Sequence, residues 1–118
     1  MNQLSATTRT TVAGPVLELV GELDHHTAPQ VRELLSGLAV EPGQQLVVDL
    51  GGLTFCDSSG ITALIAARNH ALAARATIAL VAIPDPVRRI FRIVGLDPVF
   101  PTHPTAQDAE AAWRPSGD

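Results

Sequence analysis

Apolar residues recur along the chain with two different periods, and the change from one period to the other predicts alternating strands and helices. Residues 8–12 and 16–20 are β-prone, and the turn-forming tripeptide Ala-Gly-Pro at 13–15 lies between them, so this region predicts a β-hairpin. Residues 46–50 and 77–82 are almost wholly apolar, which is typical of strands covered on both faces. We therefore expect both runs to be buried strands, with 46–50 at the centre of the sheet.

Three longer segments carry apolar residues at three- and four-residue intervals, which predicts amphipathic helices. The first is expected to start at Thr27, a candidate N-cap, and the second to run from Asp57 to about Ala74. The third is expected to start with Asp85 as its cap and to end before Gly95. The apolar positions of these helices are Val31, Leu34, Leu35, Leu38, Ile61, Leu64, Ile65, Leu72, Val87, Ile90, Phe91 and Val94.

A fourth, alanine-rich helix is predicted near the C-terminus, where Thr105 and Asp108 fit a capping pattern. Because strands and helices alternate after the hairpin, the predicted class is α/β, with a mixed sheet and helices packed chiefly against one face. Residues 1–118 are enough for one hydrophobic core and are expected to form a single domain. The core of this domain is expected to cover about 8–113, and the tail at 114–118 is expected to fray.

Composition narrows the classes of function. Apolar residues make up 46% of the chain and charged residues 17%, as in ordinary globular proteins. The net charge is −4 and the basic residues are scattered arginines, which argues against nucleic acid as a partner. The start of the chain does not read as a signal peptide, and no apolar run approaches the roughly 20 residues that span a bilayer, so we expect a cytoplasmic protein that does not bind membranes. The single cysteine, Cys56, is expected to be a buried structural thiol.

The segment Asp57-Ser58-Ser59-Gly60 is the most informative polar motif of the chain, because it connects a predicted strand to a predicted helix at the rim of the sheet. Helix capping by the Asp and Ser side chains is one interpretation. A nucleophilic serine is another, but the elbow motif Gly-x-Ser-x-Gly would need glycine at position 56, which is Cys.

Other catalytic or binding chemistry has little support in the sequence. The histidines have neither a spacing that predicts a base beside the serines nor the i, i+4 pattern of a metal site; they are His25, His26, His70 and His103. The chain also lacks a Gly-rich phosphate loop, so we expect no cofactor and no metal. An enzyme is the weaker hypothesis.

Four segments taken together resemble the anti-sigma factor antagonists of the STAS-domain family. They are Gly21 to Thr27, Val47 to Leu50, Asp57 to Ile61, and Val87 to Phe91 ahead of Gly95-Leu96. Their order and spacing match that family over most of the chain, and the combination of the first and third segments is the most specific part of the resemblance.

The resemblance implies a partner-switching cycle. The unphosphorylated protein would bind an anti-sigma factor that is also a serine kinase, and a sigma factor would thereby be released. The kinase, which would bind the ATP, would phosphorylate Ser58, and a phosphoserine phosphatase would reset the protein. The residues expected to contact the partner are Asp24, His25, Thr27, Asp57, Ser59, Gly60, Thr62 and Arg68. For Asp24 and Thr27 helix capping stays open, and for Arg68 a solvated surface position does.

Three alternatives remain beside this interpretation. The same type of domain occurs as a scaffold subunit of large sensory complexes and as the cytoplasmic tail of anion transporters. An enzyme with Ser58 as nucleophile is the third.

Overall fold

The computed structural model describes residues 3–113 and has at its centre a five-stranded sheet of order β1-β2-β3-β4-β5. The strands are β1 (Leu4–Thr10), β2 (Pro15–Leu23), β3 (Gln45–Cys56), β4 (Thr77–Val81) and β5 (Thr102–His103). β1 and β2 pair antiparallel, which confirms the predicted hairpin, and every later pairing is parallel. The sheet is therefore mixed, with β3 at its centre as predicted.

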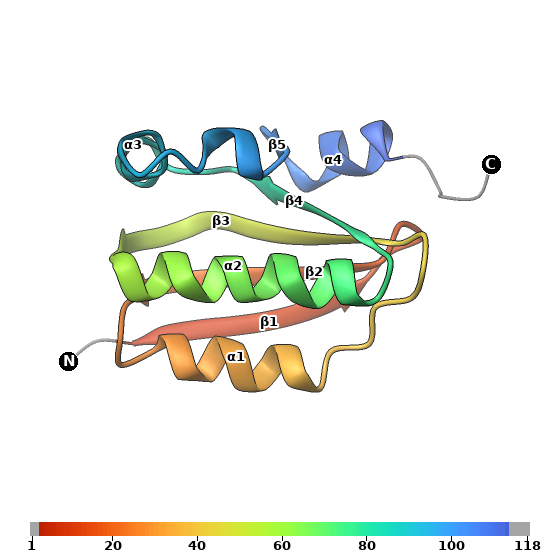
Figure 1. Ribbon diagram of the computed structural model, residues 1–118, viewed down its shortest axis with the longest axis horizontal. Coiled ribbons are helices and arrows are strands. Elements are labelled where there is room, and N and C mark those ends of the chain that lie inside the picture. The colour runs from red at the N-terminus through yellow and green to blue at the C-terminus, as the bar shows by residue number, and fades with distance from the viewer. Residues whose placement is uncertain (1–2, 114–118) are drawn as a thin grey trace.

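Helices cover both faces of the sheet, but unequally (Figure 1). They are α1 (Ala28–Ser36), α2 (Ser58–Ala73), α3 (Asp85–Ile93) and α4 (Ala106–Ala112), with one 3-10 turn, η1 (Asp97–Val99). The buried side chains of α1, α2 and α3 belong to the main core, whereas Ala109 of α4 packs on the other face against Val16 and Val47. The prediction of an α/β fold with helices chiefly on one face is confirmed.

The alternation of side chains along β3 explains these two layers. Leu46, Val48 and Leu50 point into the main core, and Val47 between them points to the opposite face. Because both faces are covered, the strand reads in sequence as a continuous apolar run rather than as an alternating one.

Several element boundaries differ from those predicted. The first strand starts at Leu4 rather than Thr8, and Val12 lies in the turn with 86% of its surface exposed. Asp85 is the first residue of α3 and not its cap, because extended Pro84 occupies the N-cap position. Val94 was predicted as an apolar position of the third helix, but it follows α3 and is 53% exposed, since the buried face of that helix ends at Phe91.

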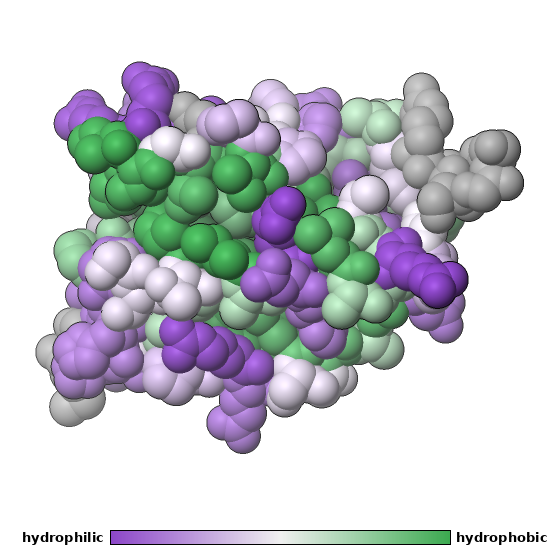
Figure 2. Space-filling model, viewed as in Figure 1, coloured by the Kyte–Doolittle hydropathy of each residue, from purple (hydrophilic) through white to green (hydrophobic). Residues whose placement is uncertain are grey.

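Apolar surface gathers at the α3 end of the molecule (Figure 2). Ile93, the last residue of α3, is 77% exposed, and Val94 after it is 53% exposed. The N-terminal end of α2 lies at the same end of the molecule (Figure 1).

The C-terminal helix is fixed at both ends. Thr105 Oγ1 accepts a hydrogen bond of 3.0 Å from the Asp108 amide, which confirms the predicted cap. At the other end, Trp113 Nε1 donates to the Gly43 carbonyl oxygen at 3.0 Å. The expected frayed tail at 114–118 lies outside the described residues. Within residues 3–113, no helix combines the length and the apolar character that a membrane crossing requires.

Candidate functional site

Ser58 is the first residue of α2, and a single residue, Asp57, separates it from the end of β3. Asp57 is extended and its Oδ1 accepts a 3.0 Å hydrogen bond from the Gly60 amide, so the predicted cap of the second helix is confirmed. The Ser58 side chain is exposed and Ser59 is half-buried. The turn therefore presents one serine hydroxyl to solvent at the rim of the sheet.

Gly60 allows α2 to approach the end of β2 closely. A Cβ atom at this position would lie 2.7 Å from the Leu23 carbonyl oxygen and 2.8 Å from Cys56 Sγ, and both of these groups are buried. The Asp57 amide donates to the same Leu23 oxygen at 3.2 Å. Glycine is thus required here by close packing, and this packing joins the serine turn to the loop that follows β2.

That loop, residues 24–27, is closed by its own polar side chains. Asp24 is only 2% exposed, and its Oδ1 accepts hydrogen bonds from the amides of His26 (2.9 Å) and Thr27 (3.1 Å). In return, Thr27 Oγ1 accepts from the Asp24 amide at 2.9 Å and donates to the Glu22 carbonyl oxygen at 2.8 Å. The loop is consequently a rigid unit beside the serine turn.

These bonds correct one part of the prediction for the first helix. Thr27 does occupy the N-cap position of α1, but its side chain caps no helix amide. Its hydroxyl is directed back to the end of β2 because the Glu22 carbonyl and the Asp24 amide lie within reach. The role of Thr27 is to hold the loop, which sequence spacing alone does not distinguish from capping.

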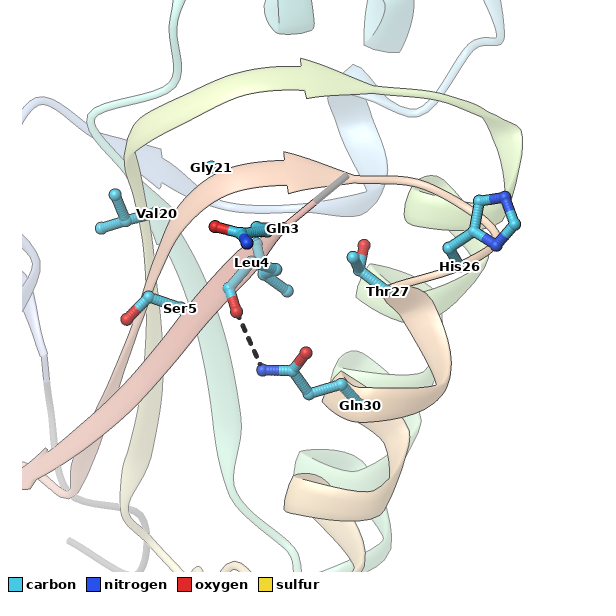
Figure 3. Close-up of a pocket in the computed structure, with 8 residues that line it drawn as sticks. All are labelled: Gln3, Leu4, Ser5, Val20, Gly21, His26, Thr27 and Gln30. Carbon is cyan, nitrogen blue, oxygen red and sulfur yellow. Dashed lines mark hydrogen bonds between the residues drawn. The ribbon is translucent and has the colours of Figure 1, made fainter. Parts of the chain in front are cut away.

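His25 and His26 form the outer surface of this loop. Both are exposed, and their rings lie 4.0 Å apart between centroids with an interplanar angle of 38°. His26 also borders a groove of about 610 Å³ between the start of β1 and the start of α1 (Figure 3). Across this groove Gln30 Nε2 donates to the Leu4 carbonyl oxygen at 3.0 Å, which ties α1 to the edge strand. No sequence pattern indicated this groove.

The remaining predicted contact residues divide into two groups. Thr62 lies one turn beyond Ser58 on α2, is exposed, and donates from Oγ1 to the Ser58 carbonyl oxygen at 3.0 Å. Arg68 is half-buried and lies ten residues along the same helix, roughly 15 Å from Ser58 at the usual rise per residue. The structure thus brings Thr62 to the serine turn and leaves Arg68 apart from it.

Cys56 and the start of α2 form the immediate surroundings of the serine turn. Cys56 is 3% exposed, and burial, followed by the neighbouring Asp57 carboxylate, raises the pKa of its thiol to about 12. This confirms the prediction of a buried structural thiol, which stays protonated at neutral pH. The first turn of α2 carries no acidic residue, and the Asp57 carboxylate at the N-cap accepts a bond from the amide of Gly60 in that turn.

Residues 3–113 contain neither a metal-binding cluster nor a serine hydrogen-bonded to a histidine. No group of three or more His, Cys, Asp or Glu side chains there could hold a metal ion. The Ser58 hydroxyl is not joined to a histidine by any hydrogen bond of that part of the chain, so the geometry adds nothing in favour of a base-activated nucleophile.

Comparisons with known proteins agree on one family. Residues 3–109 match the model of the STAS domain. An anti-sigma F factor antagonist of Lysinibacillus sphaericus is 38% identical over 98 residues, which cover 81% of this chain and 80% of the relative.

Two solved structures are similar over nearly the whole chain. The crystal structure of an anti-sigma factor antagonist from Mycobacterium paratuberculosis has a TM-score of 0.82 at 30% identity, covering 95% of each chain. The Bacillus cell fate determinant SpoIIAA in its phosphorylated form has a TM-score of 0.68 at 25% identity, covering 93% of this chain and 100% of the other.

Proposed function

Because this chain belongs to the STAS-domain family, we propose that it is an anti-sigma factor antagonist whose activity is switched off by phosphorylation of Ser58. The observation that carries the proposal is the exposed Ser58 hydroxyl at the start of α2, held against the loop that follows β2. The relatives' names support the partner class, and the phosphorylated form of SpoIIAA supports covalent control.

The fold should tolerate a phosphate on Ser58. The group adds about −1.5 to −2 charges, and the N-terminus of α2 favours an anion there by about 0.3–1 kcal/mol. Because Ser58 is exposed, no side chain has to leave the core to make room. We therefore expect the modified protein to keep its structure and its stability.

Binding to the partner should respond far more strongly. At an interface the phosphate has to be desolvated beside the Asp57 carboxylate, because Asp57 and Ser58 are adjacent at the start of α2. A mismatch of about 3 kcal/mol corresponds to roughly 100-fold in affinity. Local repulsion is thus sufficient for release, without refolding.

The proposed contact surface surrounds Ser58. Its exposed members are His25 and Thr62, and half-buried Ser59 lies between Ser58 and Gly60. Asp24 and Thr27 contribute by fixing the loop that carries His25, because their side chains are buried and bonded to each other's backbone. Arg68 lies outside this surface.

The partner in this proposal is an anti-sigma factor that is also a serine kinase and supplies the bound ATP. A phosphoserine phosphatase would complete the cycle, and the protein would act in the cytoplasm. The apolar surface at the α3 end, next to the N-terminal end of α2, would extend the contact with the kinase (Figure 2).

The decisive experiment is intact-mass analysis after incubation with ATP and the anti-sigma factor kinases of the same organism. We expect a gain of one phosphate in the wild type and in Ser59→Ala, and no gain in Ser58→Ala. Pull-down with the kinase should retain Ser58→Ala and lose Ser58→Asp.

Phosphorylation of Ser58→Ala at the wild-type rate would refute the assignment. Size-exclusion chromatography distinguishes the proposed antagonist from a scaffold subunit, since a subunit of a large sensory complex would elute in a very large particle.

A further inference from the structure

A second cavity lies at the other end of the molecule, on the sheet face that α4 covers. Its volume is about 230 Å³, and it is enclosed by the hairpin turn, the start of β3 and one side of α4. Gln45, the first residue of β3, lines it, whereas Ser58 follows the last residue of that strand. At about 3.3 Å per residue the cavity and Ser58 are roughly 35 Å apart.

Gln45 is the unusual feature of this cavity. Its side chain is only 6% exposed, and its Oε1 is buried without a hydrogen-bond partner, which buried polar atoms rarely are. The backbone of Gln45 is held in place, because its N–H group donates to the Ala13 carbonyl oxygen at 2.7 Å and the residue pairs with Thr77 in the sheet. A ligand that brings an N–H group would satisfy the oxygen after a small rotation of the amide, whose terminal torsion is soft.

The other walls define the chemistry of such a ligand. Val16 and Val47 form an apolar floor, and both are buried. Arg9 from β1 and Glu110 from α4 are exposed and line the cavity with opposite charges. The α4 wall is held in place by the Thr105 cap and the bond from Trp113 to Gly43 described above.

We propose that this cavity binds a small zwitterion of the size of a free α-amino acid with a short apolar side chain. The carboxylate pairs with Arg9, the ammonium donates to Gln45 Oε1 and Glu110, and the side chain covers Val16 and Val47. The volume lies below the roughly 300–1,000 Å³ of sites for drug-sized ligands, which excludes nucleotides. This site is independent of the proposed role of Ser58.

The test is an NMR titration of backbone amides in the full chain with L-valine. We expect saturable shifts confined to the hairpin turn, the start of β3 and α4, with a dissociation constant on the order of 1 mM for so few contact atoms. Isovalerate lacks the ammonium group and isobutylamine lacks the carboxylate, so each should bind at least about threefold more weakly. The absence of saturable shifts, or equal binding of either control compound, would overturn the proposal.

Variants test the individual contacts. Arg9→Gln and Glu110→Gln should each weaken valine binding by about three- to fivefold, the range of an exposed ion pair. Glu33→Gln, an exposed position on α1, is the matched control and should leave the affinity unchanged. Gln45→Met keeps the volume but removes the unpaired oxygen, so its melting temperature should equal or exceed that of the wild type while its valine affinity falls. Wild-type affinity in Gln45→Met would refute the role of the amide.

Discussion

Replacing Gly60 with alanine probes the contact that holds the serine turn against β2. The added Cβ would lie 2.7 Å from the Leu23 carbonyl oxygen, 2.8 Å from Cys56 Sγ and 2.9 Å from Leu23 Cγ. The Leu23 oxygen belongs to the backbone, and the short side chain of Cys56 and that of Leu23 are buried, so these atoms have little room to move. The backbone of Gly60 has no positive φ, so the cost of the substitution is steric and not conformational.

The magnitude follows from two opposing effects. Overpacking of a well-packed core costs about 1–3 kcal/mol, and the better helix propensity of alanine returns up to about 1 kcal/mol. Because all three contacts are shorter than 3.0 Å, the upper part of the overpacking range applies, and we expect Gly60→Ala to lose about 1–2 kcal/mol of unfolding free energy and roughly 4–10 °C in melting temperature. Because α2 must shift to relieve the contact, the rate of phosphorylation at Ser58 should fall as well.

Gly37→Ala is the matched control for this substitution. Gly37 follows α1 with φ of −101°, and a Cβ there would meet only the Leu34 carbonyl oxygen, at an ordinary 3.9 Å. This variant should be neutral or gain about 0.4–1 kcal/mol by restricting the unfolded chain. Urea denaturation of both variants measures the difference, and equal stability of Gly60→Ala and the wild type would refute the packing argument.

Three further predictions concern other parts of the molecule. Asp24→Ala should lose about 1–2 kcal/mol of stability in thermal denaturation, because the amides of the loop lose their buried acceptor; exposed His25→Ala should stay within about 0.5 kcal/mol, and equal melting of the two would contradict a rigid loop. The pKa of the Cys56 thiol is raised to about 12 in the folded protein, against about 8.5 for a free thiol, so below about pH 8.5 this thiol is protonated in both the folded and the unfolded chain and leaves the stability independent of pH. As pH rises above that value only the unfolded chain ionises, so stability should fall by up to about 1.4 kcal/mol per pH unit, and Cys56→Ala should show a flatter pH dependence in urea denaturation; identical slopes would exclude the thiol as the cause. Trp113→Phe removes the bond to the Gly43 carbonyl oxygen, so it should lower the unfolding free energy by about 1 kcal/mol and raise the hydrogen-exchange rate of the α4 amides above that of the α2 amides. The absence of that difference would show that this bond does not hold the helix.

The start of α2 was predictable from sequence because its determinants are local. Asp57 and Gly60 are three residues apart, and the cap requires no distant partner. The buried strands were predictable for a similar reason, since coverage of both faces leaves an unbroken apolar run such as residues 46–50.

Elements that depend on distant partners were missed. The first residues of β1, Leu4 to Thr7, are half or fully exposed because this strand lies at the edge of the sheet, so they form no buried apolar run. β5 has only two residues and exists through pairing with Leu80 and Val81, which no local pattern encodes.

In the candidate site, the residue types were predictable but not their burial. The resemblance implied that Asp24 and Thr27 contact the partner, and helix capping was left open for both. The structure shows a third arrangement, in which each side chain bonds the other's backbone. Only the three-dimensional path of the loop decides this, because both interpretations use the same spacing.

The short link between β3 and α2 fixes the position of Ser58. With a single residue between strand and helix, the hydroxyl of Ser58 has almost no freedom to move away from its place on the rim. A phosphate on Ser58, as proposed, would therefore stay at one point in space, and an approaching protein would meet an altered surface potential on an unaltered shape. Hydrolysis of that one ester bond would restore the original surface without any rearrangement of the chain.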